Sequence, residues 1–186
     1  MPPHMCRPVW ICLLLASCGG PEANLKSGDA YERFLGVREL EGRRDAASVA
    51  ELVRRLEDEH PLVVAGAVTT LGESGRKEFL QHVAPMTTHK SALVRRDACE
   101  AVGRLANPLG VPFLVKALED PDGLVRRGAV KALAVFREVP EARQALLAAL
   151  GDKDPGVVLV AHDRLREITG RRDVARTREA WAEILK

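Results

Sequence analysis

The stretch DPDGLVRRGAVKAL, residues 120–133, decides the fold of this chain. Its apolar side chains recur at i, i+4 and i+8, which places them on one stripe of a helix with 3.6 residues per turn. Copies of this stripe recur along the chain at intervals of 31 or 32 residues. A fixed period in the range of about 20–50 residues is typical of stacked structural repeats. The stripes are Val63, Ala67 and Leu71; Val94, Ala98 and Val102; Val125, Ala129 and Leu133; and Val157, Ala161 and Leu165.

A second apolar run precedes each stripe, so each repeat is predicted to contain two helices, A and B, joined by a turn. Asp before Pro in these turns favours a helix start, because Asp caps free N–H groups and Pro tolerates the first turn. The central residue of every stripe is alanine, which indicates that neighbouring helices approach closely. The A runs lie within residues 49–56, 79–83, 111–118 and 142–150.

These motifs resemble those of the HEAT repeat family, in particular the HEAT-like repeats of bacterial phycobilin lyases. The resemblance covers residues 45–169 and implies an all-α chain, an α-solenoid of stacked helix–turn–helix repeats. Val64 and Val158 stand where the family pattern has Arg. The resemblance implies no single chemistry, since one fold hosts many functions. The pattern, L-x-x-L-x-D-x-x-x-x-V-R-x-x-A-x-x-A-L-G, is matched by Leu114, Leu118, Asp120, Val125, Arg126, Ala129, Ala132 and Leu133.

Residues 1–17 have the layout of a secretory signal, in which a short apolar run and small residues follow Arg7. The segment LASC that ends at Cys18 resembles the bacterial lipobox, which implies cleavage before Cys18 and lipid attachment to it. Gly19 points to the outer membrane, so we expect an envelope lipoprotein that faces the periplasm. An ordinary buried apolar segment and an uncleaved anchor are the alternatives, and either Met1 or Met5 is the start.

Two segments are expected to flank the repeats at the N-terminal side. Residues 18–27 are polar and contain glycine, so they are predicted to form a flexible tether after the lipidated cysteine. Residues 28–44 are predicted to form a capping helix that is a degenerate copy of helix B, because the end repeat of a solenoid needs one polar face. The four full repeats then occupy residues 45–169.

Residues 170–186 are predicted to form a C-terminal capping helix. We expect Trp181, Ile184 and Leu185 to fold back over the open end of the stack. The alternative for Trp181 is an exposed aromatic anchor for a binding partner.

Composition limits the function of the mature chain. The sequence has 28 Lys and Arg residues against 26 Asp and Glu residues, and this balance argues against general polyanion binding. Cys99 is the one cysteine of the mature chain outside the lipidation position, and it is predicted to be a small core residue. His60 and His89 lie in turns, and His82 and His162 lie on different helix types in different repeats. They form no paired metal-binding motif, so no metal and no cofactor are expected.

The binding surface is predicted from the helix B positions that lie opposite the buried stripe. In HEAT-type solenoids helix B lines the concave side, so these positions are the candidate protein-binding face. A solvated surface without a binding role is the alternative for Arg96, Arg127 and Lys131. The predicted face contains Arg96, Glu100, Arg127, Lys131, Leu159 and Asp163.

A neighbouring Arg position is predicted to be structural. The resemblance implies that Arg95 and Arg126 bridge to acidic groups in the turn of the adjacent repeat, such as Asp120.

These observations predict a monomeric, non-enzymatic scaffold or adaptor that binds a protein or peptide and is anchored to the membrane by lipid. The first alternative is an accessory subunit of an enzyme, as in phycobilin lyases. The second is a nucleic-acid-binding protein like the HEAT-like glycosylases, which the charge balance and the signal layout disfavour, so no nucleic-acid partner is expected.

Overall fold

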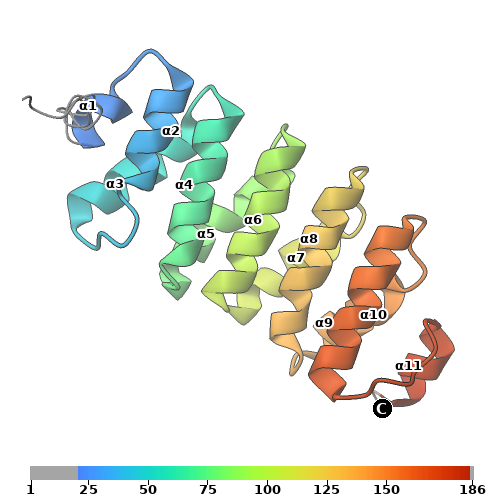
Figure 1. Cartoon of the computed structure of the whole chain (residues 1–186). Helices are drawn as coiled ribbons and strands as arrows, with labels where there is room; N and C mark the ends of the chain where they lie inside the picture. The colour runs from blue at the N-terminus through green and yellow to red at the C-terminus, as the bar shows by residue number, and fades with distance from the viewer. Residues whose placement is uncertain (1–20, 185–186) are drawn as a thin grey trace, which may run out of the picture.

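The computed structural model describes residues 21–184, and every regular element in this range is helical. The predicted signal segment, Cys18 and Leu185 lie outside the described residues. The helices form an α-solenoid with an outer row of A helices and an inner row of B helices (Figure 1). After α1 (Pro21–Leu25), the inner row contains α2 (Ala30–Arg38), α4 (Pro61–Glu73), α6 (Ala92–Leu105), α8 (Gly123–Leu133) and α10 (Pro155–Thr169). The outer row contains α3 (Ala46–Arg54), α5 (Leu80–Val83), α7 (Val111–Ala117), α9 (Pro140–Ala149) and α11 (Arg178–Ile184).

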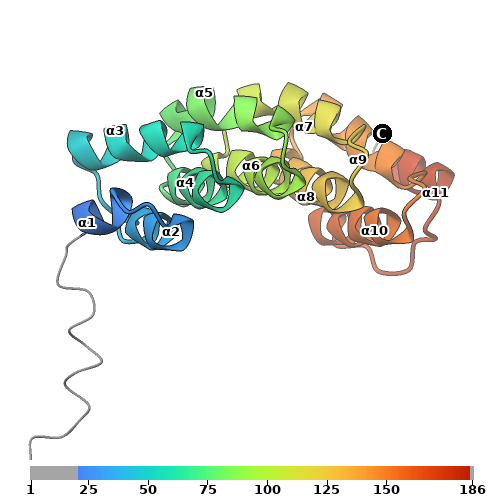
Figure 2. The same ribbon diagram turned by 90° about the horizontal axis from the view of Figure 1, so that it is seen from above.

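The two rows are curved, and the inner row lies on the concave side of the curve (Figure 2). Successive B helices pack directly on one another, from α2 on α4 to α8 on α10. The concave surface is therefore a continuous layer of parallel helices. Within the described residues, no helix is both long and apolar enough to cross a membrane.

The B helices begin at the capping residues that the turns supply. The carboxylate of Asp122 accepts a hydrogen bond of 2.7 Å from the backbone N–H of Leu124. Asp154 does the same for Gly156, also at 2.7 Å, and Pro155 occupies the first turn of α10. Each cap satisfies one of the N–H groups that a helix start leaves free.

The core of the solenoid consists of the repeated apolar stripes. The Val, Ala and Leu residues that define the period have no solvent-exposed surface in any of the four repeats. Cys99 is also fully buried beside them, and burial raises the pKa of its thiol to about 12. Cys99 is therefore a core residue, as the sequence predicts, and its thiol stays protonated at neutral pH.

Glycine sets the spacing between some B helices. A Cβ atom added at Gly72 of α4 would lie 2.6 Å from the Cβ of Ala101 on α6. A Cβ atom added at Gly103 of α6 would lie 3.0 Å from the Cβ of Ala132 on α8. Both glycines occupy the same position of the repeat, nine residues after the first stripe valine. Their missing side chains permit the close approach of consecutive B helices.

Arg–Asp pairs that are largely shielded from solvent connect the turns of adjacent repeats. Arg95 donates two hydrogen bonds to the carboxylate of Asp120, at 2.7 and 2.9 Å, so the predicted bridge is confirmed. Arg126 donates to Asp152 in the same way, at 2.8 and 2.9 Å. Each guanidinium also donates to two backbone carbonyls of its own turn, which leaves little of its hydrogen-bonding capacity unused.

A third pair of this kind lies at the N-terminal end and was not predicted. Arg33 of α2 donates to both oxygens of Asp58, each at 2.9 Å, and to the carbonyls of Ser27 and Gly28. Helix α2 therefore has the same connection to the next repeat as the later B helices. At the intervening interface Val64 occupies the Arg position, and no such pair forms among the described residues.

The segment before α2 differs from the predicted tether. Residues 21–25 form the short helix α1, and Leu25 is buried against α2. A Cβ atom at Gly36 would lie 2.9 Å from the Leu25 side chain, so the absent side chain of Gly36 provides the space for α1. The carbonyl of Leu25 also accepts a hydrogen bond from Arg55. The predicted tether therefore contains a packed helix.

The C-terminal helix α11 covers part of the last repeat. Trp181 has no exposed surface and packs edge-on against His162 of α10, with ring centroids 5.7 Å apart. His162 is held in place by a 3.0 Å hydrogen bond between its Nε2 and the carbonyl of Val174. Trp181 is thus a packing residue and not an exposed anchor.

Candidate protein-binding face

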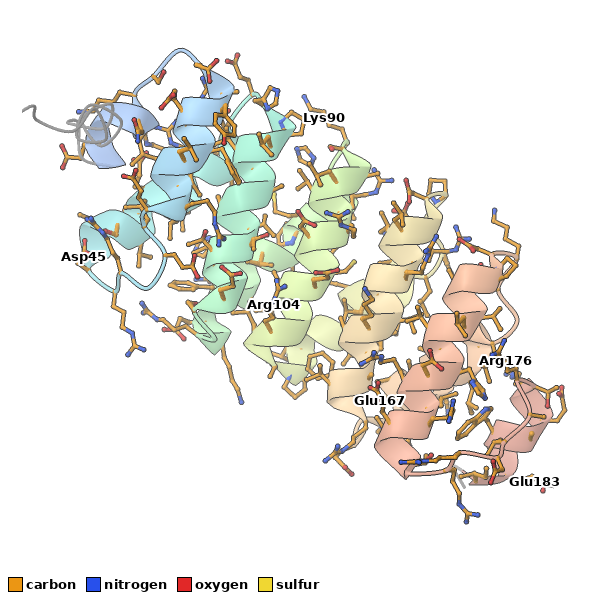
Figure 3. The ribbon with its side chains drawn as sticks, viewed as in Figure 1. Asp45, Lys90, Arg104, Glu167, Arg176 and Glu183 are labelled. Atoms are coloured by element: carbon orange, nitrogen blue, oxygen red, sulfur yellow. The ribbon has the colours of Figure 1, made fainter. Side chains whose placement is uncertain are left out.

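The candidate site is the inner face, which we define as the solvent-facing side of the B helices. On α6 this side carries Leu93, Arg96, Asp97 and Glu100, spaced at i, i+3, i+4 and i+7. This spacing places the four side chains on one face of a helix. The corresponding positions of α8 are Leu124, Arg127, Gly128 and Lys131. Figure 3 has the inner row toward the viewer, with Arg104 and Glu167 near the C-terminal ends of α6 and α10.

Two predicted arginines of the inner face lie against glycines of the next B helix. A Cβ atom added at Gly128 would lie 3.4 Å from the Cγ of Arg96. A Cβ atom added at Gly156 would lie 3.0 Å from the Cζ of Arg127. The missing side chains thus leave space on the next B helix, and the Arg side chain of the preceding repeat fills this space. Phe34 of α2 fills a similar space above Gly66 of α4.

Several of the predicted charges on this face are paired. The Nη2 of Arg96 lies 2.8 Å from an oxygen of Asp97, and Glu100 lies 3.5 Å from Arg104. Arg127 makes a longer contact of 3.5 Å to Asp154. These contacts are partly exposed, so each contributes little to stability. Their geometry shows a mixed-charge surface and not a free basic stripe.

The two remaining predicted charged residues occupy the C-terminal half of the face. Lys131 is exposed and forms no ion pair with any residue that the structure describes. Asp163 is half exposed, with one oxygen 3.8 Å from the Nδ1 of His162. The five predicted charged residues therefore share one face but do not converge on one point. This arrangement can contact an extended partner surface, and it does not bring an acid and a base together.

Exposed apolar side chains on the inner face were missed as functional candidates. Leu93 is 36% exposed and Leu124 is 49% exposed, whereas Leu159, at 41% exposed, was already part of the predicted face. Leu93 and Leu124 occupy the same repeat position, one residue before the first stripe valine, and Leu62 precedes Val63 in the same way. That register could have identified them, because a residue 100° from the buried valine is turned away from the core.

A hollow with a volume of about 300 Å³ lies near the N-terminal end of the inner face. Its apolar lining comes from Phe34, Leu62, Ala65 and Leu93, and carboxylates of Glu73 and Asp97 lie at its edge. Burial, with a smaller contribution from nearby Glu100, raises the pKa of Asp97 above its usual range.

No group of His, Cys, Asp and Glu side chains in residues 21–184 has the arrangement of a metal site.

The chain is similar to a curated protein that is a subunit of a lyase. The chain is 29% identical over 165 residues to phycocyanobilin lyase subunit alpha of Nostoc sp. strain PCC 7120. The match covers 88% of this chain, which spans about half the relative's length, 48%. The expectation of a non-enzymatic chain is wrong in the light of this match, because the relative is a subunit of a lyase.

Solved structures support the same architecture. The Escherichia coli protein YibA superimposes with a TM-score of 0.66 at 22% identity, over 78% of this chain and 57% of YibA. The complex of CpcE and CpcF of phycocyanin lyase from Nostoc sp. PCC7120 superimposes with a TM-score of 0.51 at 20% identity. That match covers 90% of this chain and 82% of the lyase chain. At these identities the likeness establishes the fold alone.

The sequence profile of HEAT repeats matches most of the chain. The matched segments are residues 22–102 and 80–166, which together extend from α1 through most of α10. The match begins before residue 45, where the sequence pattern placed the first full repeat. It agrees with the position of α2 in the inner row and with the Arg33–Asp58 pair. This chain belongs to the HEAT repeat family.

Proposed function

We propose that this chain is the partner-binding subunit of a lyase-type enzyme and that its inner face holds a protein partner. The observation that carries the proposal is the set of exposed leucines, Leu93, Leu124 and Leu159, on an otherwise charged concave surface. Large apolar side chains surrounded by charged ones are typical of protein interfaces, in which an apolar centre has a polar rim.

The curated relative supports the enzymatic part of the proposal. It is named as one subunit of a phycocyanobilin lyase, so its activity belongs to an assembly of subunits. The solved complex of CpcE and CpcF is also an assembly of two chains of a lyase. A HEAT solenoid without a convergent catalytic cluster on its inner face contributes to such an assembly by holding and orienting the other protein.

The inner face is suited to this role because its side chains are pre-positioned. Arg96 and Arg127 lie against Gly128 and Gly156, so part of their conformational freedom is already lost before a partner binds. Preorganisation of this kind lowers the entropic cost of association. The leucines provide the apolar area, and the charged rows on either side determine which partner surface is complementary.

The test compares the native complex of the wild-type chain with that of Leu93→Glu/Leu124→Glu. We expect the wild type to elute as a larger complex from size-exclusion chromatography, and the inner-face variant to elute alone. Truncation or reversal of an interface centre commonly costs more than about 2 kcal/mol of binding free energy, or roughly thirtyfold in affinity. The recovered complex should attach phycocyanobilin to an acceptor protein, and the inner-face variant should lack this activity.

The matched control is Leu109→Glu/Val115→Glu, which places the same charges on the outer side of the third repeat. Leu109 is 74% exposed, so this control should leave the fold, the complex and the activity intact. An inner-face variant that keeps the complex would contradict the proposed surface. A complex that forms but attaches no bilin, in the wild type as well as in the variants, would instead contradict the lyase role.

The cellular location of the protein is a separate proposal that rests on the lipobox resemblance at Cys18. We expect the mature chain to begin at Cys18, to carry a diacylglyceryl group and to be in the outer membrane. Mass spectrometry of the N-terminal peptide from native cells tests this location. An unmodified Cys18 within an uncleaved chain would show that the location is wrong.

A further inference from the structure

A group of arginines lines an open pocket at the C-terminal end of the inner row. The pocket has a volume of about 420 Å³ and lies where α10 ends and the connection to α11 begins. Four of its lining residues are arginines and two are acidic, which leaves an excess of two positive charges. The lining consists of Asp163, Arg164, Arg166, Glu167, Gly170, Arg171 and Arg172.

The acidic residues of the pocket do not neutralise these arginines. Glu167 accepts a contact of 2.6 Å from the Nη1 of Arg164. The side chains of Arg166, Arg171 and Arg172 form no ion pair or hydrogen bond with any residue between 21 and 184. The Nε atoms of Arg164 and Arg166 are moreover shielded from solvent without an acceptor in the described part of the chain. A shielded donor without an acceptor is unfavourable, and an external acceptor relieves this cost.

The repeat register explains why an arginine occupies this place. Arg166 lies nine residues after Val157, as Gly72 and Gly103 lie nine residues after Val63 and Val94. In the first two repeats this position is a glycine against which the next B helix packs, and in the third repeat it is the small residue Ala134. The structure describes no B helix beyond α10, and α11 packs on the outer row against α9. The side of α10 that would receive another helix therefore presents a guanidinium group.

We propose that this pocket is a docking site for an acidic segment of a protein partner, with two or more neighbouring Asp or Glu side chains. Arg binds carboxylates through paired, charge-assisted hydrogen bonds, and the three unpaired arginines offer several such forks. The site lies at the end of the array, whereas Leu93 and Leu124 lie near its middle. The proposal needs only the folded chain and does not rest on the lyase-type role.

Two features favour separate carboxylates over one compact anion. Asp163 and Glu167 lie among the arginines, so a compact dianion in the pocket would be repelled by both. The C-terminal end of α10 also directs the negative end of its helix dipole toward this region. Carboxylates that are spread along a peptide can each contact a guanidinium while they avoid these negative groups.

The test measures binding of fluorescein-labelled octa-glutamate to the full chain by fluorescence anisotropy, at about 50 mM salt. Arg166→Gln/Arg171→Gln/Arg172→Gln should weaken binding at least about tenfold, because truncation of interface charges removes both attraction and hydrogen bonds. Replacement of the same three residues by Lys keeps the charge but removes the fork, and it should give an intermediate affinity. Circular dichroism establishes that each variant is folded. If a triple variant is not folded, the double variant Arg171→Gln/Arg172→Gln is measured in its place.

The matched control is Arg43→Gln/Arg44→Gln/Arg137→Gln, which removes the same charge from exposed positions elsewhere. Its affinity for octa-glutamate should stay within about twofold of the wild type at this ionic strength. An equal loss in both triple variants would overturn the proposal, since it would reflect net charge alone. Absence of saturable wild-type binding would also overturn it, as would complete displacement of the peptide by an equimolar amount of inorganic phosphate.

Discussion

Arg126→Ala is expected to lower the free energy of unfolding by about 3 kcal/mol or more. Arg126 is only 4% exposed, and its guanidinium holds the carboxylate of Asp152 and the carbonyls of Asp120 and Pro121. Removal of the guanidinium leaves a shielded carboxylate without its partner. The hydrogen bonds from Arg126 are the largest cause of the lowered pKa of Asp152, and they outweigh the effect of burial. Urea unfolding followed by circular dichroism measures the loss.

The neighbouring residue provides the control for this prediction. Arg127 differs from Arg126 by one position along α8, is more exposed and makes only a 3.5 Å contact with Asp154. Arg127→Ala should therefore cost less than about 1 kcal/mol, as is usual for an exposed ion pair. Equal losses for the two variants would show that the Arg–Asp pairs do not hold adjacent repeats together.

Gly72→Val is expected to lower the free energy of unfolding by roughly 3 kcal/mol, the upper part of the range for overpacked sites. The added Cβ atom would lie 2.6 Å from the Cβ and 2.7 Å from the Cα of Ala101. A backbone atom cannot move aside as the end of a flexible side chain can. Helices α4 and α6 must therefore separate, and their packing is among the most extensive in the array. Thermal unfolding measures the result as a lower Tm.

Gly28→Val is the matched control for the same substitution. No atom lies within 4 Å of a Cβ added at Gly28, and its backbone conformation is open to other residues. We expect a change within about 0.5 kcal/mol, as for ordinary surface substitutions. A Gly72→Val variant as stable as the wild type would show that α4 and α6 can separate at low cost. That result would contradict the role of Gly72 in the close packing of the inner row.

The fold was predictable because its signal is local and repeated. One stripe of Val, Ala and Leu defines the period, and the family pattern then assigns Arg95 and Arg126 to contacts with the next repeat. The Arg33–Asp58 pair was not predicted, because Glu32 stands where later repeats have the first stripe valine and hides the register. Helix α1 was missed for a different reason, since its packing depends on the space above Gly36 and not on a local pattern.

The candidate site was predictable in position and less so in character. Helical spacing places Arg96, Arg127 and Lys131 on the inner face. It does not show that Arg96 pairs with its neighbour Asp97, because side-chain orientation decides that contact. Leu93 and Leu124 were overlooked because the predicted face was taken only from the positions two and six residues after the first stripe valine. The non-enzymatic prediction was wrong, since repeat patterns describe a scaffold and carry no information on the assembly to which it belongs.

The most direct test of the inner-face account is site-specific photo-crosslinking in native cells. A photoreactive residue in place of Lys131 on the inner face is compared with one in place of Arg137, after the end of α8. We predict a specific crosslinked partner at position 131, its loss in the Leu93→Glu/Leu124→Glu background, and no such product at position 137. The same partner at position 137 and none at position 131 would contradict the account.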